Sequence, residues 1–494
     1  MRDPWNHPWL GSANLREMRA YSEKVWDFAL AHAARFDRPL SLALSNNMAQ
    51  SMYKWSCMLA RQGHKVRLFS RSDDKTAFSA PQWEEFDGNA EDLYAQAWQE
   101  EQMPKIPLAV PHTTHCTHIS WEAAETWRRW VKEADYASFF HFYRTKNLNP
   151  APFLLDLQVS MFAEMAQDFQ GFDAAFGTMD IAPLYLSGTP YSFFSAGGDL
   201  DIICSRRDAY GDITRLAAES ASFAVVSNPH AVGHLRRLGL TNGLYLPYPM
   251  DDGKYCPGPG KARKEWEAAV GQGLFVLVSS RLEKKVKGFD NNAWQALFAA
   301  AERSPDLRFV FIMWGTHAEE TRRQLEDSPL CGKVVFLKPA GKVRLIDYYR
   351  SCDVVLDQLK YGYYGATALE AAACGKPVIM FIREEQYSPL YNGDVAPVEN
   401  VLKHSDITAA LIRLAQNREL RLEHGKAMRE WLVRNHGEQK TAPLLAALLR
   451  LTADGARLPK SLQSPLLAPV SEKEAAFNTA YEDWDRYQEQ DHED

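Results

Sequence analysis

Residues 361–379 read YGYYGATALEAAACGKPVI, and this stretch decides the fold. A glycine turn at Gly365 precedes a small-residue helix that carries one carboxylate, Glu370, and a Gly-x-Pro sequence stops that helix before an apolar strand. Gly365 allows a tight backbone turn, so we expect the amides of residues 364–367 to face outward with the helix dipole behind them. Such a helix start binds phosphate, and Glu370 would accept hydrogen bonds from ribose hydroxyls. The alternative is an ordinary helix that packs on a parallel sheet through its alanines.

A second stretch, GLFVLVSSRLEKKVKGFDNNAWQALFAAA (273–301), predicts an apolar strand, a basic loop and a helix. Arg281 and Lys287 lie in the loop. Open α/β sheets bind ligands outside the carboxyl ends of their strands, so we expect both cations on one rim with the Gly365 turn, where they converge on a diphosphate. The alternative is a solvated lysine cluster over residues 284–287, which is typical of surface lysines.

The sequence between these two stretches completes a parallel sheet. LRFVFIMWG (307–315), KVVFLKPA (333–340) and a strand that ends in CDVVL (352–356) alternate with helical sequence, which is the spacing of βαβ units. The ordered series SRLxxxxKG, FxxxG, VxFL, CDVVL and LEAAACGKPVI resembles the C-terminal donor domain of the retaining, group 1 GT-B glycosyltransferases over residues 273–450. The resemblance implies an α/β fold of the GT-B type, in which two Rossmann-like domains face a cleft.

The resemblance also implies roles for individual residues. Arg281 and Lys287 would hold the donor diphosphate and stabilise its departure, and the backbone of 337–340 would flank the nucleotide base. The donor-binding set comprises Arg281, Lys287, Tyr364, Gly365, Ala366, Thr367 and Glu370. The catalytic candidates are Asp199, Arg281 and Lys287. The donor substrate is then a nucleotide diphosphate sugar, with no cofactor and no metal ion required.

One position departs from the family pattern. The family carries two glutamates eight positions apart, and the position eight residues before Glu370 is Gly362. Asp357, Tyr363 and Tyr364 are neighbours that could replace the missing carboxylate, and the sequence does not choose among them. The donor sugar, the competence for transfer and the retention of anomeric configuration all depend on this position.

The N-terminal half also predicts α/β structure. Its strands and helices are LSLALSNNM (40–48), a helix, HKVRLFSR (64–71), and further units at 171–203 and 223–251. This half is similar to the acceptor domain of the same family. We expect an N-terminal domain at 1–250 with a helical, aromatic insertion at about 72–165, and a donor domain at 251–458 that starts in the glycine- and proline-rich DDGKYCPGPGK.

The last segment, 459–494, predicts a tail whose final helix crosses back to the N-terminal domain. Ser471 and Glu474 have the spacing of a capping box, which marks the start of that helix.

The glycine pair in GGDLDII (197–203) marks the candidate acceptor side. Gly197 and Gly198 bring the backbone close to a sugar, and Asp199 would orient an acceptor hydroxyl or take its proton. The alternatives are a plain strand exit and a D-x-D metal site formed with Asp201.

Two patterns in the insertion leave alternatives open. His112, His115, Cys116 and His118 resemble zinc ligands, but they crowd one short loop where a structural site needs four well-placed ligands, so we expect no metal. WRRWVKEADYASFFHFYR (127–144) mixes cations with aromatic residues. Contact with a membrane surface is one interpretation, and burial of the aromatic residues in a core is the other.

Length and composition limit the function classes. The 494 residues, 46% of them apolar, suffice for two domains with cores of their own. A net charge of −7 argues against a general nucleic-acid binder. No apolar run reaches about 18 residues, and the start MRDPWNHPWLGS lacks a signal pattern. The seven cysteines show no paired spacing, which suits reduced thiols. We expect a cytoplasmic location, with peripheral contact to the inner face of a membrane left open.

The expected function is that of an enzyme. The resemblance implies a metal-independent, hexosyltransferase-like glycosyltransferase that moves a sugar from a nucleotide sugar to a hydroxyl of a glycan, a lipid-linked or a protein acceptor. Such a reaction belongs to glycan or glycoconjugate synthesis. One alternative is a noncatalytic partner of another transferase that binds nucleotide sugar or glycan. The other is a nucleotide-sugar epimerase or phosphorylase, because the same architecture supports both.

Overall fold

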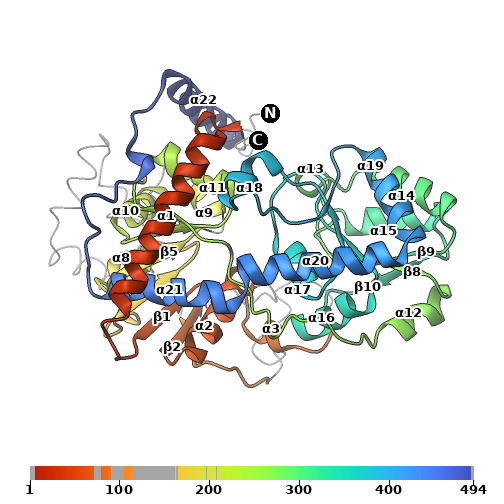
Figure 1. Cartoon of the computed structure of the whole chain (residues 1–494), viewed down its shortest axis with the longest axis horizontal. Coiled ribbons are helices and arrows are strands. Elements are labelled where there is room, and N and C mark those ends of the chain that lie inside the picture. Colours follow the sequence, from red (N-terminus) through yellow and green to blue (C-terminus); the bar gives the residue numbers. More distant parts are fainter. Residues whose placement is uncertain are drawn as a thin grey trace. The chain divides into compact units, whose positions relative to one another are not determined.

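The computed structural model describes residues 6–71, 79–90, 105–115, 162, 165–195, 197–206 and 209–490. The chain divides into two compact units (Figure 1). Unit 1 comprises Met1–Asp74, Ala109–Tyr248 and Ala442–Asp494, and unit 2 comprises Lys75–Leu108 and Pro249–Thr441. Each unit holds one parallel sheet with helices, so the expected α/β class is confirmed.

The sheet of unit 1 has the order β3-β2-β1-β4-β5-β6-β7, and all its pairings are parallel. Its strands are β1 (Ser41–Ser45), β2 (Lys65–Arg71), β3 (His112–His115), β4 (Ala174–Gly177), β5 (Tyr191–Phe194), β6 (Ala224–Val226) and β7 (Gly243–Tyr245). Within the described residues, the α-helices of this unit are α1 (Ser12–Ala33), α2 (Ser51–Arg61), α8 (Ala182–Leu186), α9 (Gly198–Asp201), α10 (Ala209–Ser220), α11 (Pro229–Leu238) and α22 (Glu472–Gln490).

The sheet of unit 2 has the order β10-β9-β8-β11-β12-β13, again parallel throughout. Its strands are β8 (Leu274–Val278), β9 (Leu307–Ile312), β10 (Val334–Leu337), β11 (Val354–Leu356), β12 (Val378–Met380) and β13 (Glu399–Asn400). The helices are α3 (Gln82–Glu85), α12 (Arg263–Val270), α13 (Lys284–Lys287), α14 (Asn291–Arg303), α15 (Ala318–Glu326), α16 (Lys342–Ser351), α17 (Ala366–Ala373), α18 (Glu384–Leu390), α19 (His404–Gln416) and α20 (Arg418–His436). Helix α21 (Glu438–Ala453) begins in unit 2 and ends in unit 1.

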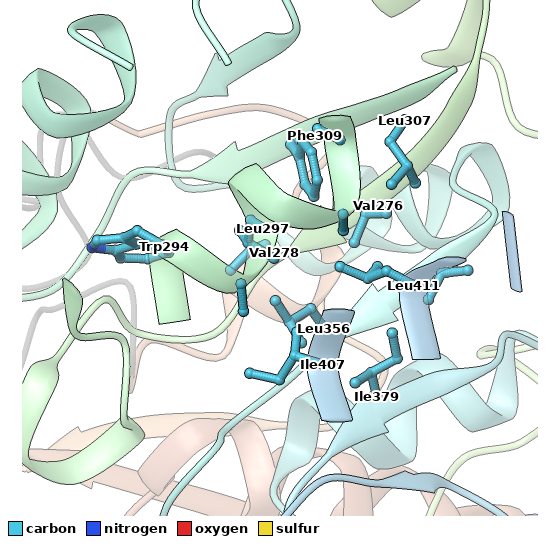
Figure 2. Close-up of a cluster of buried hydrophobic side chains, with 14 of the residues drawn as sticks. Val276, Val278, Trp294, Leu297, Leu307, Phe309, Leu356, Ile379, Ile407 and Leu411 are labelled. Carbon is cyan, nitrogen blue, oxygen red and sulfur yellow. The ribbon is translucent and has the colours of Figure 1, made fainter. Parts of the chain in front are cut away.

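The core of unit 2 explains why its strands read as continuous apolar runs. All five residues of β8 are buried, as expected for a central parallel strand covered on both faces. Figure 2 shows side chains of the strands, among them Val276 and Phe309, beside Leu297 of α14 and Leu411 of α19. Full burial of each such side chain contributes about 1.5–3 kcal/mol, so this cluster holds the sheet that carries the candidate site.

Helix ends follow the signals in the sequence. The carboxylate of Asp290 caps α14, because it accepts from the amides of Asn292 and Ala293 at 3.0 and 3.1 Å. Gly375 follows α17 with a φ of +71°, the left-handed conformation expected after a helix. The expected capping box of α22 is confirmed, because Ser471 and Glu474 exchange backbone-to-side-chain hydrogen bonds of 2.9 and 3.3 Å.

The two units differ from the expected domain limits in three places. The division falls at Tyr248 and Pro249, against an expected 250–251. Residues 442–458, expected in the donor domain, belong to unit 1 together with the tail 459–494. Part of the insertion assigned to the N-terminal domain, residues 75–108, belongs to unit 2. This last difference arises because residues 79–90 form hydrogen bonds with distant residues of unit 2, such as that between Glu84 and Tyr255.

Candidate active site

The carboxyl ends of β8 and β11 form a topological switch point. From β8 the chain proceeds to β9 and β10 on one side, and it returns to β11 on the other side of β8. The loops after these two strands therefore diverge, which is where open α/β sheets bind ligands. Ser280, after β8, donates a hydrogen bond to the buried carboxylate of Asp357, after β11, and so joins the two loops.

Arg281 lies at this rim, directly after Ser280. Its guanidinium pairs with Glu283 at 2.9 Å and is 32% exposed, so the pair is weak enough for an anion to compete. Gly315 makes room for the arginine, because a Cβ at Gly315 would lie 2.8 Å from Cγ of Arg281. The backbone bond from Leu282 to the carbonyl of Trp314 (2.9 Å) fixes the two loops together. The FxxxG motif thus positions Arg281.

Lys287 reaches the glycine turn after β11. Its ammonium lies 5.3 Å from the centre of the Tyr363 ring. The amide of Leu359 donates a hydrogen bond to the Lys287 carbonyl at 2.8 Å. Lys284 points elsewhere, because it pairs with Glu320 at 2.5 Å. Lys284 and Lys287 of this cluster therefore differ: Lys284 forms a surface ion pair, and Lys287 lies beside the turn.

The N-terminus of α17 lies open at the same rim. Gly365 is its N-cap residue and supplies no side-chain cap, so the amides of Ala366 and Thr367 begin the helix without one. A Cβ added at Gly365 would meet no atom within 4 Å, which leaves space in front of the helix dipole. Tyr364 differs from the expectation, because its amide donates to the Tyr387 hydroxyl at 3.0 Å and its side chain is buried.

The tight turn lies at Gly362 rather than at Gly365. Gly365 has an extended backbone with a φ of −91°, whereas Gly362 has a φ of +76°. A Cβ at Gly362 would lie 2.7 Å from Cγ of Arg383 and 2.9 Å from the Phe381 ring. The position of the family's first glutamate therefore has neither the backbone conformation nor the space for a side chain.

The three proposed replacements for that glutamate occupy different environments. Asp357 is 2% exposed and bound by Ser280. The Tyr364 hydroxyl accepts a hydrogen bond from the Ala396 amide (3.2 Å) within an aromatic cluster. Tyr363 is half-buried and faces Lys287. Of the three, Tyr363 is the residue that lies beside Lys287, at the carboxyl ends of the strands of the second sheet.

Glu370 is buried one turn into α17. One carboxylate oxygen accepts from the Lys342 ammonium at 2.6 Å, and the other accepts from the Tyr349 hydroxyl at 3.3 Å. Burial, followed by the charge of Glu370, raises the pKa of Tyr349 well above its ordinary value, so the phenol stays a donor. Lys342 and Tyr349 both lie on α16. Neither residue was predicted as part of the site, and the available signal was the basic residue that opens the helix after VVFL.

Asp199 anchors a turn in unit 1. Its buried carboxylate accepts from the Ser195 hydroxyl at 2.6 Å, the Gly197 amide at 3.2 Å and the Leu200 amide at 2.9 Å. The hydroxyl of Tyr481 donates to Asp201, so the two aspartates of the D-x-D sequence bind different partners. This arrangement does not favour a shared metal ion.

The glycine pair Gly197 and Gly198 faces two residues that were not predicted as site residues. A Cβ at Gly197 would lie 3.7 Å from Nε2 of His230, and one at Gly198 would lie 3.7 Å from Met179. Burial, then the neighbouring His234, lowers the pKa of His230 to about 3, so this imidazole is neutral.

The switch point of the first sheet lies between β1 and β4, and strained backbone surrounds it. Asn46, Ala49 and Gln50 after β1 and Met179 after β4 all have positive φ, between 50° and 65°. Such strain in non-glycine residues clusters at functional sites. The neighbouring Asp180 pairs with Arg71 at 2.7 Å. The polar runs SNNM and TMD after two apolar strands were the signal for this rim.

The remaining sequence patterns lie partly outside the described residues. His112 and His115 lie on β3 rather than in a loop, and His112 pairs with Ser70 at 2.7 Å. Cys116, His118 and 127–144 fall outside the described residues. Within the part that the structure describes, no group of three or more metal-ligating side chains gathers and no helix is long and apolar enough to cross a membrane.

Comparison with known proteins gives the class of the second unit. Residues 261–431 match a sequence model of the family described as glycosyl transferases group 1. The mannosylfructose-phosphate synthase of Agrobacterium fabrum is 27% identical over 146 residues, which cover 28% of this chain and 32% of that protein. The D-inositol 3-phosphate glycosyltransferase of Mycobacteroides abscessus is 37% identical over 89 residues, or 17% and 20% of the two chains. The chain thus spans about a third or less of the curated relatives that it matches.

Solved structures extend the likeness to both units. The Anabaena protein HepE, in complex with UDP and glucose, matches with a TM-score of 0.54 and 12% identity over 83% of this chain and 99% of that chain. Sucrose-phosphate synthase from Thermosynechococcus elongatus matches with a TM-score of 0.53 and 16% identity over 85% and 100%. The chain has the GT-B fold of two parallel sheets. Within its second unit, residues 261–431 are similar to the group 1 glycosyl transferases.

Proposed function

We propose that this protein transfers a sugar from a nucleotide diphosphate sugar to an acceptor hydroxyl. The arrangement at the rim of the second sheet carries the proposal. Lys287 lies beside the turn that leads into α17, the first turn of α17 has no side-chain cap, and Glu370 lies one turn further on. Cation, helix dipole and carboxylate suit the diphosphate and ribose of one ligand.

The chemistry follows from where charge develops. As the bond between the anomeric carbon and the diphosphate oxygen breaks, its electron pair moves onto the leaving diphosphate. Arg281, Lys287 and the amides of Ala366 and Thr367 would stabilise that charge as fixed donors, in the way a bound metal ion does elsewhere. The acceptor oxygen forms the new bond to the anomeric carbon, and its proton passes to an oxygen of the departing diphosphate.

The acceptor would bind at the rim of the first sheet. Gly197 and Gly198 border a turn that Asp199 holds from within, so the carboxylate acts on the acceptor through this turn. The alternative, inferred from the sequence, is that Asp199 itself accepts the proton. The two roles predict different stabilities and transfer rates for the same Asp199 variants.

Thermal unfolding with UDP, GDP, ADP, CDP and dTDP, each with and without magnesium, tests the donor site. We expect one nucleotide to raise the melting temperature regardless of magnesium, and the shift to disappear in Arg281→Ala and Lys287→Ala. Lys284→Ala is the matched control, because Lys284 has its own partner on the surface. If none of the nucleotides stabilised the wild type, the proposed function would be wrong.

A noncatalytic nucleotide-sugar binder is the second candidate. The blocked Gly362 position favours it, because the carboxylate that contacts the sugar in the family pattern has no place there. Donor binding without transfer to any acceptor would support this candidate, and turnover of the donor without acceptor would support an epimerase.

Partners and location complete the proposal. HepE was solved with UDP, which makes UDP-sugars the first donors to screen. The acceptor would be a glycan, a lipid-linked or a protein hydroxyl, and the location cytoplasmic. Co-sedimentation with anionic liposomes tests contact with a membrane face. Full recovery of the protein in the supernatant would exclude that contact.

A further inference from the structure

The peptide group between Tyr363 and Tyr364 is held on both sides. Its N–H, on Tyr364, donates to the hydroxyl of Tyr387 at 3.0 Å, and its carbonyl, on Tyr363, accepts from the side-chain amide of Gln358. Tyr387 and Gln358 are both 0% exposed. The plane of this peptide group is therefore fixed, although the group belongs to no helix or strand.

This peptide group lies between two parts of the candidate donor site. On one side the Tyr363 ring faces the Lys287 ammonium, and on the other side Gly365 begins α17. A rotation of the peptide plane would therefore turn the Tyr363 ring and the first amides of α17 together.

Tyr387 is itself fixed by a buried aromatic cluster. The centroid of its ring lies 4.3 Å from that of Tyr364 and 5.9 Å from that of Tyr391. Trp431 of α20 packs on both Tyr364 and Tyr391, and the amide of Ala396 donates to the Tyr364 hydroxyl at 3.2 Å. Close packing on several sides leaves the Tyr387 side chain one orientation, so its hydroxyl is a fixed acceptor.

The start of α18 binds the same turn a second time. The amide of Arg383 donates to the Gly362 carbonyl at 3.0 Å, and the amide of Tyr387 donates to the Arg383 carbonyl at 3.1 Å. Helix α18 therefore holds the turn at two points, at Gly362 through the backbone and at Tyr364 through the Tyr387 side chain.

We propose that Tyr387 is a positioning residue of the donor site, whose hydroxyl orients the amides that face the diphosphate. The inference rests on the proposed function. Donors that already point at the place where charge develops need no reorganisation when the ligand binds or reacts. Because the Tyr387 hydroxyl takes up the Tyr364 amide, the donors that face the ligand belong to the first turn of α17.

Calorimetric titration of the full chain with UDP, GDP, ADP, CDP, dTDP and pyrophosphate tests this role. In Tyr387→Phe, which removes only the hydroxyl, we expect about tenfold weaker binding of the preferred nucleotide, because the donors lose their alignment. Pyrophosphate binding should weaken by the same factor, because the change affects the part of the site that holds the diphosphate.

Tyr391→Phe is the matched control. It removes a buried hydroxyl of the same cluster, one that lies 2.9 Å from Nε2 of His436. We expect a similar loss of stability and an unchanged nucleotide affinity, whereas a purely structural role of Tyr387 would affect both variants alike. Hydrogen exchange followed by mass spectrometry reports the amide directly. Exchange of the segment that contains Tyr364 should accelerate in Tyr387→Phe and stay slow in Tyr391→Phe.

A second variant keeps the test independent of how well Tyr387→Phe folds. Gln358→Met removes the hydrogen bond on the other side of the same peptide group, so it should weaken nucleotide and pyrophosphate binding in the same way.

Other outcomes would overturn the inference. Equal affinities of Tyr387→Phe and Tyr391→Phe would do so and leave the proposed function intact. Tighter binding by Tyr387→Phe would show that the hydroxyl withholds the Tyr364 amide from the ligand. A loss for nucleotides with pyrophosphate unchanged would place the effect at the nucleoside. A wild type that binds none of the nucleotides would overturn the proposed function together with this inference.

Discussion

The ammonium of Lys342 lies 2.6 Å from the carboxylate of Glu370, whose side chain is 1% exposed. Removing one partner of a buried ion pair leaves the other charge uncompensated, at a cost of about 3–5 kcal/mol. We therefore expect Lys342→Met to lower the free energy of unfolding by about 3 kcal/mol in urea denaturation. The double variant Lys342→Met, Glu370→Gln should recover part of this loss. Equal stability of Lys342→Met and wild type would contradict the pairing.

Restoring the family glutamate at Gly362 should damage the fold. The position has a φ of +76°, and a Cβ there would lie 2.7 Å from the Arg383 side chain. We expect Gly362→Glu to lower the free energy of unfolding by about 1–3 kcal/mol, because the backbone would be strained and the site overpacked. Gly365→Ala is the matched control, because its Cβ meets no atom within 4 Å and its φ is negative, so its melting temperature should stay near that of wild type. A stable Gly362→Glu would show that the turn can rearrange.

The sequence was sufficient to predict the fold class and where Arg281, Lys287 and Gly365 lie in it, because both depend on local patterns. Apolar runs of strand length alternate with helical periods, and Arg281 and Lys287 follow one strand while Gly365 precedes a helix. The order of these motifs placed them on one rim of the sheet. The same helical pattern placed Glu370 one turn into the helix that follows Gly365.

The contacts that complete the site could not be predicted, because they depend on packing between distant segments. Glu84 and Tyr255 are 171 positions apart, and their hydrogen bond holds an insertion segment in unit 2. Lys342 meets Glu370 through the packing of two helices. The backbone conformations of Gly362 and Gly365 are likewise decided by neighbours such as Arg383, so glycine content alone assigned the tight turn to the wrong residue.

The tail of unit 1 should show acid-dependent stability. Burial alone would raise the pKa of Glu474, but hydrogen bonds from Arg236 and Ser471 outweigh it and lower the pKa to about 2. A folded-state pKa below the ordinary value of 4.5 contributes stability that is present above pH 4.5 and is lost as the pH falls toward 2. We expect Glu474→Gln to destabilise the protein at pH 7 and to differ less from wild type near pH 3. A constant difference across this range would contradict the lowered pKa.

Two substitutions at Asp199 separate a turn anchor from a proton acceptor. Asp199 accepts hydrogen bonds from Ser195, Gly197 and Leu200 through one oxygen, and an asparagine carbonyl can accept the same bonds. If Asp199 is an anchor, the Asp199→Asn variant should keep the melting temperature and most of the transfer rate of the wild type. Asp199→Ala should lose about 1–3 kcal/mol of stability, because it leaves buried donors unsatisfied. As a proton acceptor, Asp199→Asn would instead keep its stability and lose transfer by about 100-fold or more, with the pH dependence of the rate altered. Measuring unfolding and transfer on both variants therefore decides between the two roles, and the buried position of the carboxylate favours the anchor.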